Sequence, residues 1–217
     1  TTAITLHHRA LDQGAEGFNW EERLARSGQR NGSKVIGVGV GQAFHSAGRS
    51  GYDGLVRLTP DGKLHIHNGA GNLGTYSYGS TSRVAAEVLK CTWENCVIHR
   101  GDSRKHLPWS PTQTGSNTSF TMTRSNYVAA MDALQKLKEI AAMDIGGSPD
   151  DYDIADEAVF LKTDKTMRIT YAEAAQRAIE LGGIFSAEEL PEDIHEVTRQ
   201  AVAGVVGTGL VGVAKDD

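Results

Sequence analysis

Apolar residues recur every three or four positions along one long segment, and this spacing predicts the clearest helix of the chain. The segment reads TMTRSNYVAAMDALQKLKEIAAMDIGG, and its apolar face comprises Val128, Met131, Leu134, Leu137 and Ile140. Such a set lies on one side of a helix with 3.6 residues per turn. The pair Gly146–Gly147 predicts the end of this helix, because glycine adopts a left-handed conformation at little cost.

Runs of β-branched residues predict strands in other segments. SKVIGVGVGQAF (33–44) is rich in Val, Ile and Gly, and NCVIHRG (95–101) is a second short apolar run. GLVRL and KLHIHNG flank the turn TPDG, in which Pro60, Asp61 and Gly62 favour a hairpin. EAVFLK and TMRIT predict another hairpin around TDK.

Capping residues predict the remaining helices. In NWEERLAR (19–26), Asn19 is the expected N-cap. STSRVAAEVLKC (80–91) is expected to start at Ser80 or Thr81 and to turn Val84, Val88 and Leu89 inward.

Two capping boxes are expected near the end of the sequence. Thr170 and Glu173 form one before YAEAAQRAIEL, which Gly182–Gly183 terminates, and Ser186 and Glu189 repeat the pattern. A last helix is expected from about Pro191 to Ala203.

The predicted order of elements is strand, hairpin, helix, strand, polar loop, helix, hairpin, helix, helix. Hairpins that alternate with helices favour an α+β fold with a two-layer mixed sheet and helices on one face, rather than a parallel doubly wound sheet. We expect an N-terminal helical linker at 1–32, an α+β core at 33–145 and a second α+β portion at 146–217 that continues beyond the chain end.

Composition narrows the classes of function. The 217 residues carry a net charge of −5 with a pI near 5.9, which argues against non-specific nucleic-acid binding. Cys91 and Cys96 give no disulfide framework and only a poor zinc motif, so a reducing, cytoplasmic compartment is expected. The apolar run 201–214 contains four glycines and is shorter than the roughly 20 residues of a membrane span. The start TTAITLHH and the end GVAKDD indicate a segment of a longer chain.

Several motifs give little support for a catalytic or metal site. GVGVG (37–41) is followed by Gln42 and by no helical pattern, so it does not match a dinucleotide-binding turn. His65 and His67 share one strand face, but no third metal ligand is evident, and they are interpreted as surface or edge histidines. No nucleophile–base or paired-carboxylate pattern identifies catalytic residues.

Two polar, glycine-containing features remain. The first is the turn before the helix RVAAEVL, within GAGNLGTYSYGSTSRVAAEVL. The second lies within GDSRKHLPWSPTQTGSNTSF (101–120), just before the longest predicted helix. Backbone N–H groups at such turns and helix starts can hold an anion, such as a phosphate. The alternative is a helix-capping loop with surplus polar residues, and the residues alone leave both open.

At these two features the sequence resembles the molybdenum hydroxylases, the xanthine oxidase, aldehyde oxidase and carbon monoxide dehydrogenase family, in their large molybdopterin-binding subunit. The likeness covers roughly residues 33–145 and consists of pieces in one order: GVGVGQAF, a hairpin, GAGNLGT, RVAAEVL, VIHRGDS and TGSNTSFTMTR. RITYAEAAQRAIELGG extends a weaker likeness toward the end of the chain.

The resemblance implies a molybdopterin-binding fold and a set of residues that contact the molybdenum cofactor. The implied contacts are Gly71, Asn72, Leu73 and Gly74 in the turn and Thr114, Gly115, Ser116, Asn117, Thr118 and Ser119 in the loop. It also implies iron–sulfur clusters and FAD in partner domains or subunits, association with the rest of the large subunit, and a homo-oligomeric complex.

The implied activity is hydroxylation of an aldehyde or heteroaromatic carbon with oxygen from water. Alternatives are a molybdenum-dependent hydratase on the same scaffold and a non-catalytic binding or structural fragment. The turn departs from the family's G-Q-G, because Asn72 supplies a shorter amide and Leu73 is additional. The family's catalytic glutamate and its Gly-Phe-Gly loop do not occur in these residues, so the segment is expected to bind the cofactor without supplying the catalytic base.

Overall fold

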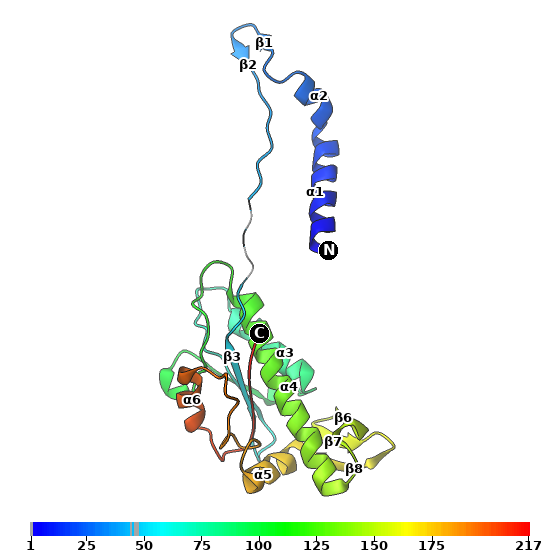
Figure 1. Cartoon of the computed structure of the whole chain (residues 1–217), viewed down its shortest axis with the longest axis vertical. Helices are drawn as coiled ribbons and strands as arrows, with labels where there is room; N and C mark the ends of the chain where they lie inside the picture. The colour runs from blue at the N-terminus through cyan, green and yellow to red at the C-terminus, as the bar shows by residue number, and fades with distance from the viewer. Residues whose placement is uncertain (1, 44, 46–47) are drawn as a thin grey trace. The chain divides into compact units, whose positions relative to one another are not determined.

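The computed structural model describes residues 2–43, 45 and 48–217. Two compact units make up the chain, residues 1–44 and residues 45–217 (Figure 1). Within the described residues, no helix is both long enough and apolar enough to cross a membrane.

The N-terminal unit is a set of short elements without a hydrophobic core among its described side chains. Its elements are α1 (Thr2–Phe18), α2 (Trp20–Ala25), β1 (Arg30–Asn31) and β2 (Lys34–Val35). None of the side chains described between residues 7 and 43 is fully buried. Apolar burial at these residues therefore contributes little to holding the unit together.

Sequence prediction was only partly correct in this unit. The helix expected at 19–26 is present as α2, but Asn19 has a left-handed φ of 54° and its side chain caps nothing. α1 was not predicted. The strand expected at 33–44 is wrong beyond Lys34–Val35, because residues 36–43 join no ladder, and Phe44 lies outside the described residues. Gly37, Gly39 and Gly41 weaken a strand there, since glycine loses the most backbone entropy on ordering.

A mixed four-stranded sheet in the order β5-β4-β3-β9 forms the centre of the second unit. Its strands are β3 (Asp53–Leu58), β4 (Leu64–His67), β5 (Cys96–His99) and β9 (Leu210–Lys215). β3 and β4 form the predicted hairpin, and Gly62 takes the positive φ of 79° that the turn requires. β5 runs parallel to β4, whereas β9, which was not predicted, pairs antiparallel with β3.

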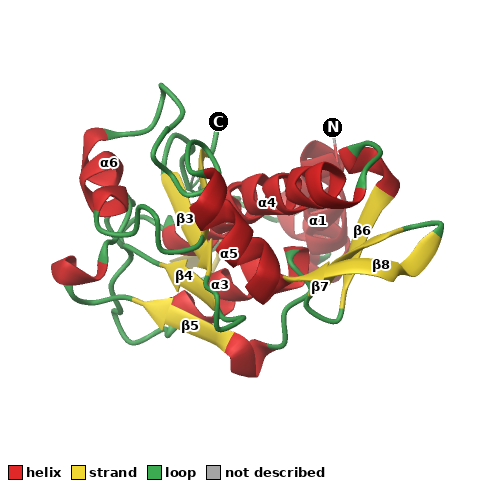
Figure 2. Ribbon diagram, turned by 90° about the horizontal axis from the view of Figure 1, so that it is seen from below, coloured by secondary structure: helices red, strands yellow, loops and turns green. Residues whose placement is uncertain are grey.

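Three helices contribute to the main core on one face of this sheet (Figure 2). They are α3 (Ser77–Val88), α4 (Thr118–Ile145) and α5 (Tyr171–Leu181). On the opposite face, Leu55, Val211 and Val213 pack with Val202 of α6 (Glu196–Ala203) and with Val205 just after it. The predicted α+β class with a mixed sheet is confirmed, and α6 adds cover on the second face.

A small three-stranded sheet follows α4. Its strands are β6 (Tyr152–Ala155), β7 (Ala158–Leu161) and β8 (Asp164–Thr170), joined as a meander. Three short 3₁₀ turns complete the described elements: η1 (Trp93–Asn95), η2 (Ser103–Lys105) and η3 (Pro149–Asp151). β7 and β8 are the second predicted hairpin, whereas β6 was not predicted.

Several predicted helix boundaries need correction. α3 begins at Ser77, one turn before Ser80, and buries Ala85 and Ala86 while Val84 and Val88 are only partly covered. The box of Ser186 and Glu189 starts no helix, because residues 183–189 form turns, and α6 begins only at Glu196. The Thr170–Glu173 box and the stop of α4 at Gly146 are confirmed.

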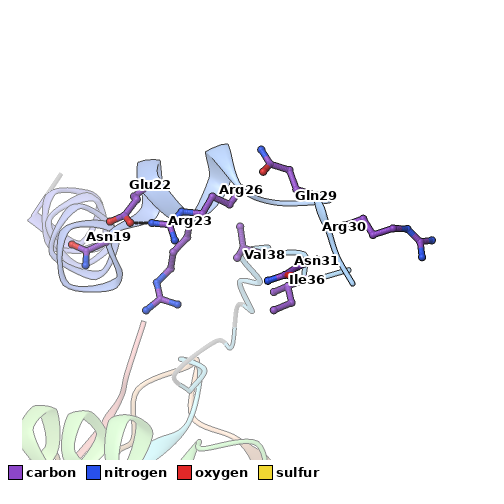
Figure 3. A pocket seen from close by; sticks show the side chains of 9 residues that line it. All are labelled: Asn19, Glu22, Arg23, Arg26, Gln29, Arg30, Asn31, Ile36 and Val38. Atoms are coloured by element: carbon purple, nitrogen blue, oxygen red, sulfur yellow. Dashed lines mark ion pairs between the residues drawn. The ribbon is translucent and has the colours of Figure 1, made fainter. Parts of the chain in front are cut away.

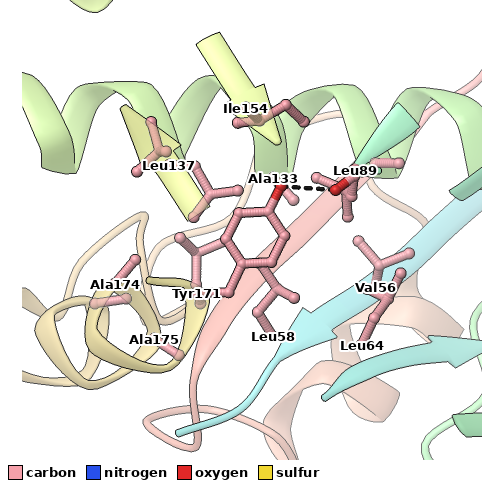
Figure 4. Packing of buried hydrophobic residues seen from close by; sticks show 14 of the residues in the cluster. Val56, Leu58, Leu64, Leu89, Ala133, Leu137, Ile154, Tyr171, Ala174 and Ala175 are labelled. Carbon is pink, nitrogen blue, oxygen red and sulfur yellow. Dashed lines mark hydrogen bonds between the residues drawn. The ribbon is translucent and has the colours of Figure 1, made fainter. Parts of the chain in front are cut away.

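Tyr171 joins the two sheets and the helices of the core. It is 1% exposed, and its hydroxyl donates to the carbonyl of Leu89 at the end of α3 over 2.6 Å (Figure 4). Figure 4 shows the ring among Leu58, Leu137 and Ile154, which come from β3, α4 and β6. Burial of the ring and of its hydrogen-bonded hydroxyl raises the pKa of Tyr171 above its ordinary value.

α4 lies unusually close to the sheet because glycines stand where it crosses the strands. A Cβ atom on Gly54 of β3 would lie 2.8 Å from the Cβ of Ala129 and would collide with the carbonyl of Ser125. A Cβ atom on Gly212 of β9 would lie 2.7 Å from the Cβ of Ala133. Glycine on the strands and small residues on the helix are therefore required for this packing distance.

We expect Gly54→Ala to destabilise the domain by about 3 kcal/mol, because the added methyl group pushes α4 off the sheet. Gly79→Ala is the matched control. Gly79 lies inside α3, where an added methyl group would meet no described atom within 4 Å, and the change gains about 0.5–1 kcal/mol of helix stability. Urea unfolding measures both free energies. Equal effects of the two substitutions would show that the crossing tolerates a side chain.

Candidate functional site

The two polar segments singled out in the sequence lie in connections that start at the same end of the sheet. The turn 71–74 follows β4, and the loop that contains 114–119 follows β5. β4 and β5 are parallel neighbours, so both connections begin at the ends of adjacent strands. We call these two segments, 71–74 and 114–119, the cradle.

The two connections touch before they reach the cradle. A Cβ atom on Gly69 would lie 2.5 Å from the carbonyl oxygen of Pro108 and would collide with the Ser110 hydroxyl. Further along, a Cβ atom on Gly71 would lie 3.1 Å from Oε1 of Gln113, and Gln113 donates from Nε2 to the Ser77 hydroxyl over 3.3 Å. The structure thus brings together the two segments that the sequence singled out separately.

The turn 71–74 is shaped by its own amide side chain. Asn72 accepts hydrogen bonds at Oδ1 from the backbone N–H groups of Gly74 and Tyr76, each over 3.0 Å. Gly74 has a φ of 97°, which favours glycine. Leu73 projects into solvent with 74% of its surface exposed. The oxygen of Asn72 is therefore used inside the turn, and an apolar side chain stands at its tip.

The first half of the connection after β5 is firmly anchored. The Trp109 ring stacks on Tyr52 at 6.0 Å and on His195 at 4.3 Å between centroids. The Trp109 backbone N–H donates to the Thr198 hydroxyl of α6 over 2.8 Å. Asp53 is fully buried beside this anchor and accepts at Oδ2 from the N–H of His195. The connection thus enters the cradle from a fixed position.

The second half of the connection is open. Thr114, Gly115 and Ser116 are exposed, and Gly115 and Ser116 both have left-handed φ values of 61° and 57°. Thr118 and Ser119 form the first turn of α4. Within the described part of the chain, none of the hydroxyls of Thr114, Ser116, Thr118 and Ser119 takes part in a hydrogen bond.

Asn117 differs from its neighbours in the cradle. It is 9% exposed, and its Oδ1 accepts from the Thr121 hydroxyl inside the first turn of α4. The same hydroxyl also lies 2.7 Å from the carbonyl oxygen of Arg49, so its single proton is shared between the two acceptors. Asn117 therefore fixes the start of α4 from within, whereas the neighbouring hydroxyls are left for solvent or a ligand.

Both helices of the cradle begin at the same end of the domain. Asn126, two turns into α4, donates from Nδ2 to the carbonyl of Thr81, one turn into α3. Among the described residues, no side chain caps the N-terminus of either helix. Two uncapped helix starts with exposed hydroxyls nearby provide N–H and O–H donors to an anionic group, and the positive ends of both helix dipoles favour it.

A stack of three histidines lies on β4 and β5, the strands that lead into the two connections. The His99 ring packs against His67 at 4.4 Å and against His65 at 5.0 Å, and His65 Nδ1 lies 2.7 Å from His99 Nε2. His67 is 1% exposed and donates from Nδ1 to the Lys105 carbonyl, which leaves its buried Nε2 without a partner among the described residues. The prediction that His65 and His67 are surface or edge residues is wrong for His67, which is buried, and neither lies on an edge strand, because β4 is an inner strand. His65 is half-buried.

The stack is held neutral by its surroundings. Burial, followed by the charge that His99 would carry, lowers the pKa of His67 to about 3. Burial, followed by the nearby Arg57 guanidinium, lowers the pKa of His65 to about 4 and also lowers that of His99. In the described ranges, no group of three His, Cys, Asp or Glu side chains is arranged to hold a metal ion.

The two cysteines are both held as thiols. Cys91 and Cys96 form no disulfide. Burial raises the pKa of Cys96 to about 11 and raises that of Cys91 further. Neither is a thiolate at neutral pH, so neither is a nucleophile.

A separate pocket of about 680 Å³ belongs to the N-terminal unit (Figure 3). Figure 3 shows α2 and the following segment supplying its walls, with Glu22 paired to Arg26 and with Arg23 and Arg30 nearby. No cradle residue lines it. The described residues that line it include no buried polar group, so nothing in the pocket indicates a binding site.

Comparison with protein families shows to which family the chain belongs. A family model described as a molybdopterin cofactor-binding domain matches residues 13–207. The chain belongs to this family. The match includes every residue of the cradle and the histidine stack, and the resemblance inferred from the order of motifs is confirmed.

Individual relatives agree with this assignment. The aldehyde oxidoreductase molybdenum-binding subunit PaoC of Escherichia coli (strain K12) is 33% identical over 180 residues, which is 82% of this chain and 23% of that protein. The chain thus spans about a quarter of the length of the curated relatives it matches.

Solved structures share the fold at lower identity. Reconstituted CO dehydrogenase from Oligotropha carboxidovorans matches with a TM-score of 0.57 at 18% identity, over 77% of this chain and 18% of that one. Quinoline 2-oxidoreductase from Pseudomonas putida 86 matches with a TM-score of 0.52 at 18% identity, over 77% and 19%. These likenesses support the molybdopterin-binding-domain-like fold.

Sequence reasoning missed Gln113, His99 and Trp109. The alternation of His65 and His67 was visible, but His99 joins them only through the parallel register of β4 and β5. Gln113 directly precedes the predicted loop and was not distinguished from its polar neighbours. The stacking of Trp109 could not be predicted, because its partners Tyr52 and His195 are distant from it in sequence.

We expect the stability of the domain to fall on acidification from about pH 6.5 to pH 5. The folded chain keeps His67 neutral while the unfolded chain takes up a proton, so unfolding is favoured by about 1.4 kcal/mol per pH unit for each such proton. Above pH 7 both states are neutral at this residue and its contribution is fully present. Unfolding free energies measured across this range give the slope.

His67→Gln is expected to flatten that slope, whatever its effect on stability at pH 7. Substitution of the exposed His8 by Gln is the control, because His8 lies in the N-terminal unit and not in the domain whose unfolding is measured. An unchanged slope in the His67 variant would show that the stack does not stay neutral.

Proposed function

We propose that the chain supplies the molybdopterin-binding cradle of a longer molybdenum-dependent oxidoreductase. The observation that carries the proposal is the contact between the two connections at Gly71 and Gln113, which brings the segments 71–74 and 114–119 toward each other before the uncapped starts of α3 and α4. Membership of the cofactor-binding family agrees with it. The open hydroxyls and free backbone N–H groups match a ligand that combines a phosphate with a polar ring system.

Each cradle residue has a distinct proposed role. The hydroxyls of Thr114, Ser116, Thr118 and Ser119 donate to the phosphate and the pterin. Gly71, Gly74 and Gly115 allow the backbone to approach the ligand, since they carry no Cβ atom. Asn72 and Asn117 shape the turn and the helix start, in keeping with their internal hydrogen bonds. Leu73 presents an apolar surface that excludes water.

We further propose that the complete enzyme hydroxylates an aldehyde or heteroaromatic carbon with oxygen taken from water. The bound molybdenum cofactor supplies the two-electron chemistry. This chain binds and orients it, and the catalytic base comes from another part of the enzyme. Iron–sulfur clusters and FAD in partner domains or subunits carry the electrons away, so we expect the chain to work within a multi-subunit assembly.

Removal of two cradle hydroxyls tests the binding role. Ser116→Gly combined with Thr118→Val deletes both donors and keeps the local backbone, since glycine tolerates the left-handed φ and valine resembles threonine in shape. We expect the complete protein to retain about tenfold less molybdenum and pterin after buffer exchange, because two lost hydrogen bonds of about 0.7 kcal/mol each total about 1.4 kcal/mol. Metal analysis and pterin content measure the loss.

Thr163→Val is the matched control, because Thr163 is exposed in the turn between β7 and β8 and lies outside the cradle. Full retention of molybdenum and pterin in the double variant would remove the cradle assignment. Molybdenum without accompanying iron in the native complex would favour the hydratase alternative, since hydration transfers no net electrons.

A further inference from the structure

Gln113 occupies a position between the two halves of the cradle. Its side chain is half-buried, and its amide nitrogen donates to the hydroxyl of Ser77, the first residue of α3. Ser77 itself is only 7% exposed. A residue of one connection therefore holds the helix start that follows the other connection.

The oxygen of the same amide lies against the turn. A Cβ atom on Gly71 would come within 3.1 Å of Gln113 Oε1, a distance at which one of the two groups must give way. Gly71 and Ser77 bracket the turn 71–74 in sequence. The amide thus contacts the segments on both sides of the turn.

Gln113 is also the last fixed point before the open half of the loop. Upstream, Trp109 is stacked between two rings and Ser110 lies against Gly69. Downstream, 114–116 is exposed, and the side chains of its described residues form no hydrogen bond. The spacing between turn and loop is therefore fixed at this residue.

We propose that Gln113 is a positioning residue that clamps the turn 71–74 to the loop 114–119 and so sets the width of the cradle. It acts through Ser77 and Gly71. The proposal rests on the function proposed above for what the cradle holds, but the clamp itself is a property of the protein without ligand.

Hydrogen exchange of the backbone amides tests the clamp in the absence of cofactor. In the complete protein prepared without cofactor, Gln113→Ala is expected to speed exchange in 71–77 about three- to tenfold, the ratio that one lost hydrogen bond gives. Gln135→Ala is the matched control, because Gln135 is an exposed glutamine of α4 whose side chain donates to Glu139. Unchanged exchange in 71–77 of the Gln113 variant overturns the proposal.

A second pair of variants separates positioning from general stability. Ser77→Ala combined with Gln113→Ala is expected to speed exchange no more than Gln113→Ala alone, because the Gln113 change already removes the bond to Ser77. Additive effects of the two changes would show that Gln113 and Ser77 act independently and would overturn the clamp.

Gln113→Glu distinguishes the clamp from the ligand. The Ser77 hydroxyl can donate to the new carboxylate, so exchange in 71–77 is expected to stay within about twofold of the unmodified protein. The added negative charge lies beside the start of α3 and is expected to lower molybdenum and pterin retention about tenfold in the loaded protein, because it repels an anionic ligand. Rapid exchange in this variant would contradict the clamp geometry.

The two proposals fail in different ways. If the unmodified protein retains no pterin, the proposed function fails, and the exchange data still decide the clamp. If it retains pterin and Gln113→Ala changes neither exchange nor retention, the clamp alone is wrong.

Discussion

The close crossing of α4 over β3 and β9 is the constraint on which the rest of the domain depends. Gly54 and Gly212 bring the helix backbone almost onto the strands, with Ala129 and Ala133 between them. A helix of 28 residues held at this distance fixes both its own start and the strands that it covers. The first turn of α4 is one wall of the cradle, so the placement of the cradle follows from glycine and alanine far from it in sequence.

The other wall of the cradle, the turn 71–74, is placed by the parallel direction of β4 and β5. The helical crossover from β4 through α3 to β5 makes the two strands parallel, and their following connections leave one edge together. The histidine stack packs on β4 and β5, and Trp109 stacks on Tyr52 and His195 at the start of the second connection. A rigid scaffold that carries loops with open hydroxyls is what a ligand site built on loops requires.

Elements that depend only on neighbouring residues were predicted correctly from the sequence. The existence of the helix α4, the Thr170–Glu173 box and the TPDG hairpin were predicted correctly because each depends on neighbouring residues. The apolar face predicted for α4 was only partly correct, because Met131 is 40% exposed while the small residues Ala129 and Ala133 are buried. β9 was missed because Gly212 and its neighbouring valines form a short apolar run that is not recognisable as a strand without its partner β3. The α+β class followed from the order of elements, but the cover of the second face by α6 needed the long-range contacts of Leu55. Resemblance and polarity predicted the ten cradle residues. The role of Gln113 could not be predicted, because it depends on the contact between two connections that are separate in sequence.

The uncapped starts of α3 and α4 have a thermodynamic consequence. A side-chain cap contributes about 1 kcal/mol to the stability of a helix, and no described side chain provides this contribution at the start of α3 or α4. An anion bound at these helix starts would supply the missing partners, and a ligand that binds only the folded chain adds to its stability by mass action. Binding of the proposed ligand and ordering of the helix starts would then be one equilibrium, in which the bound anion raises the free energy of unfolding of the domain.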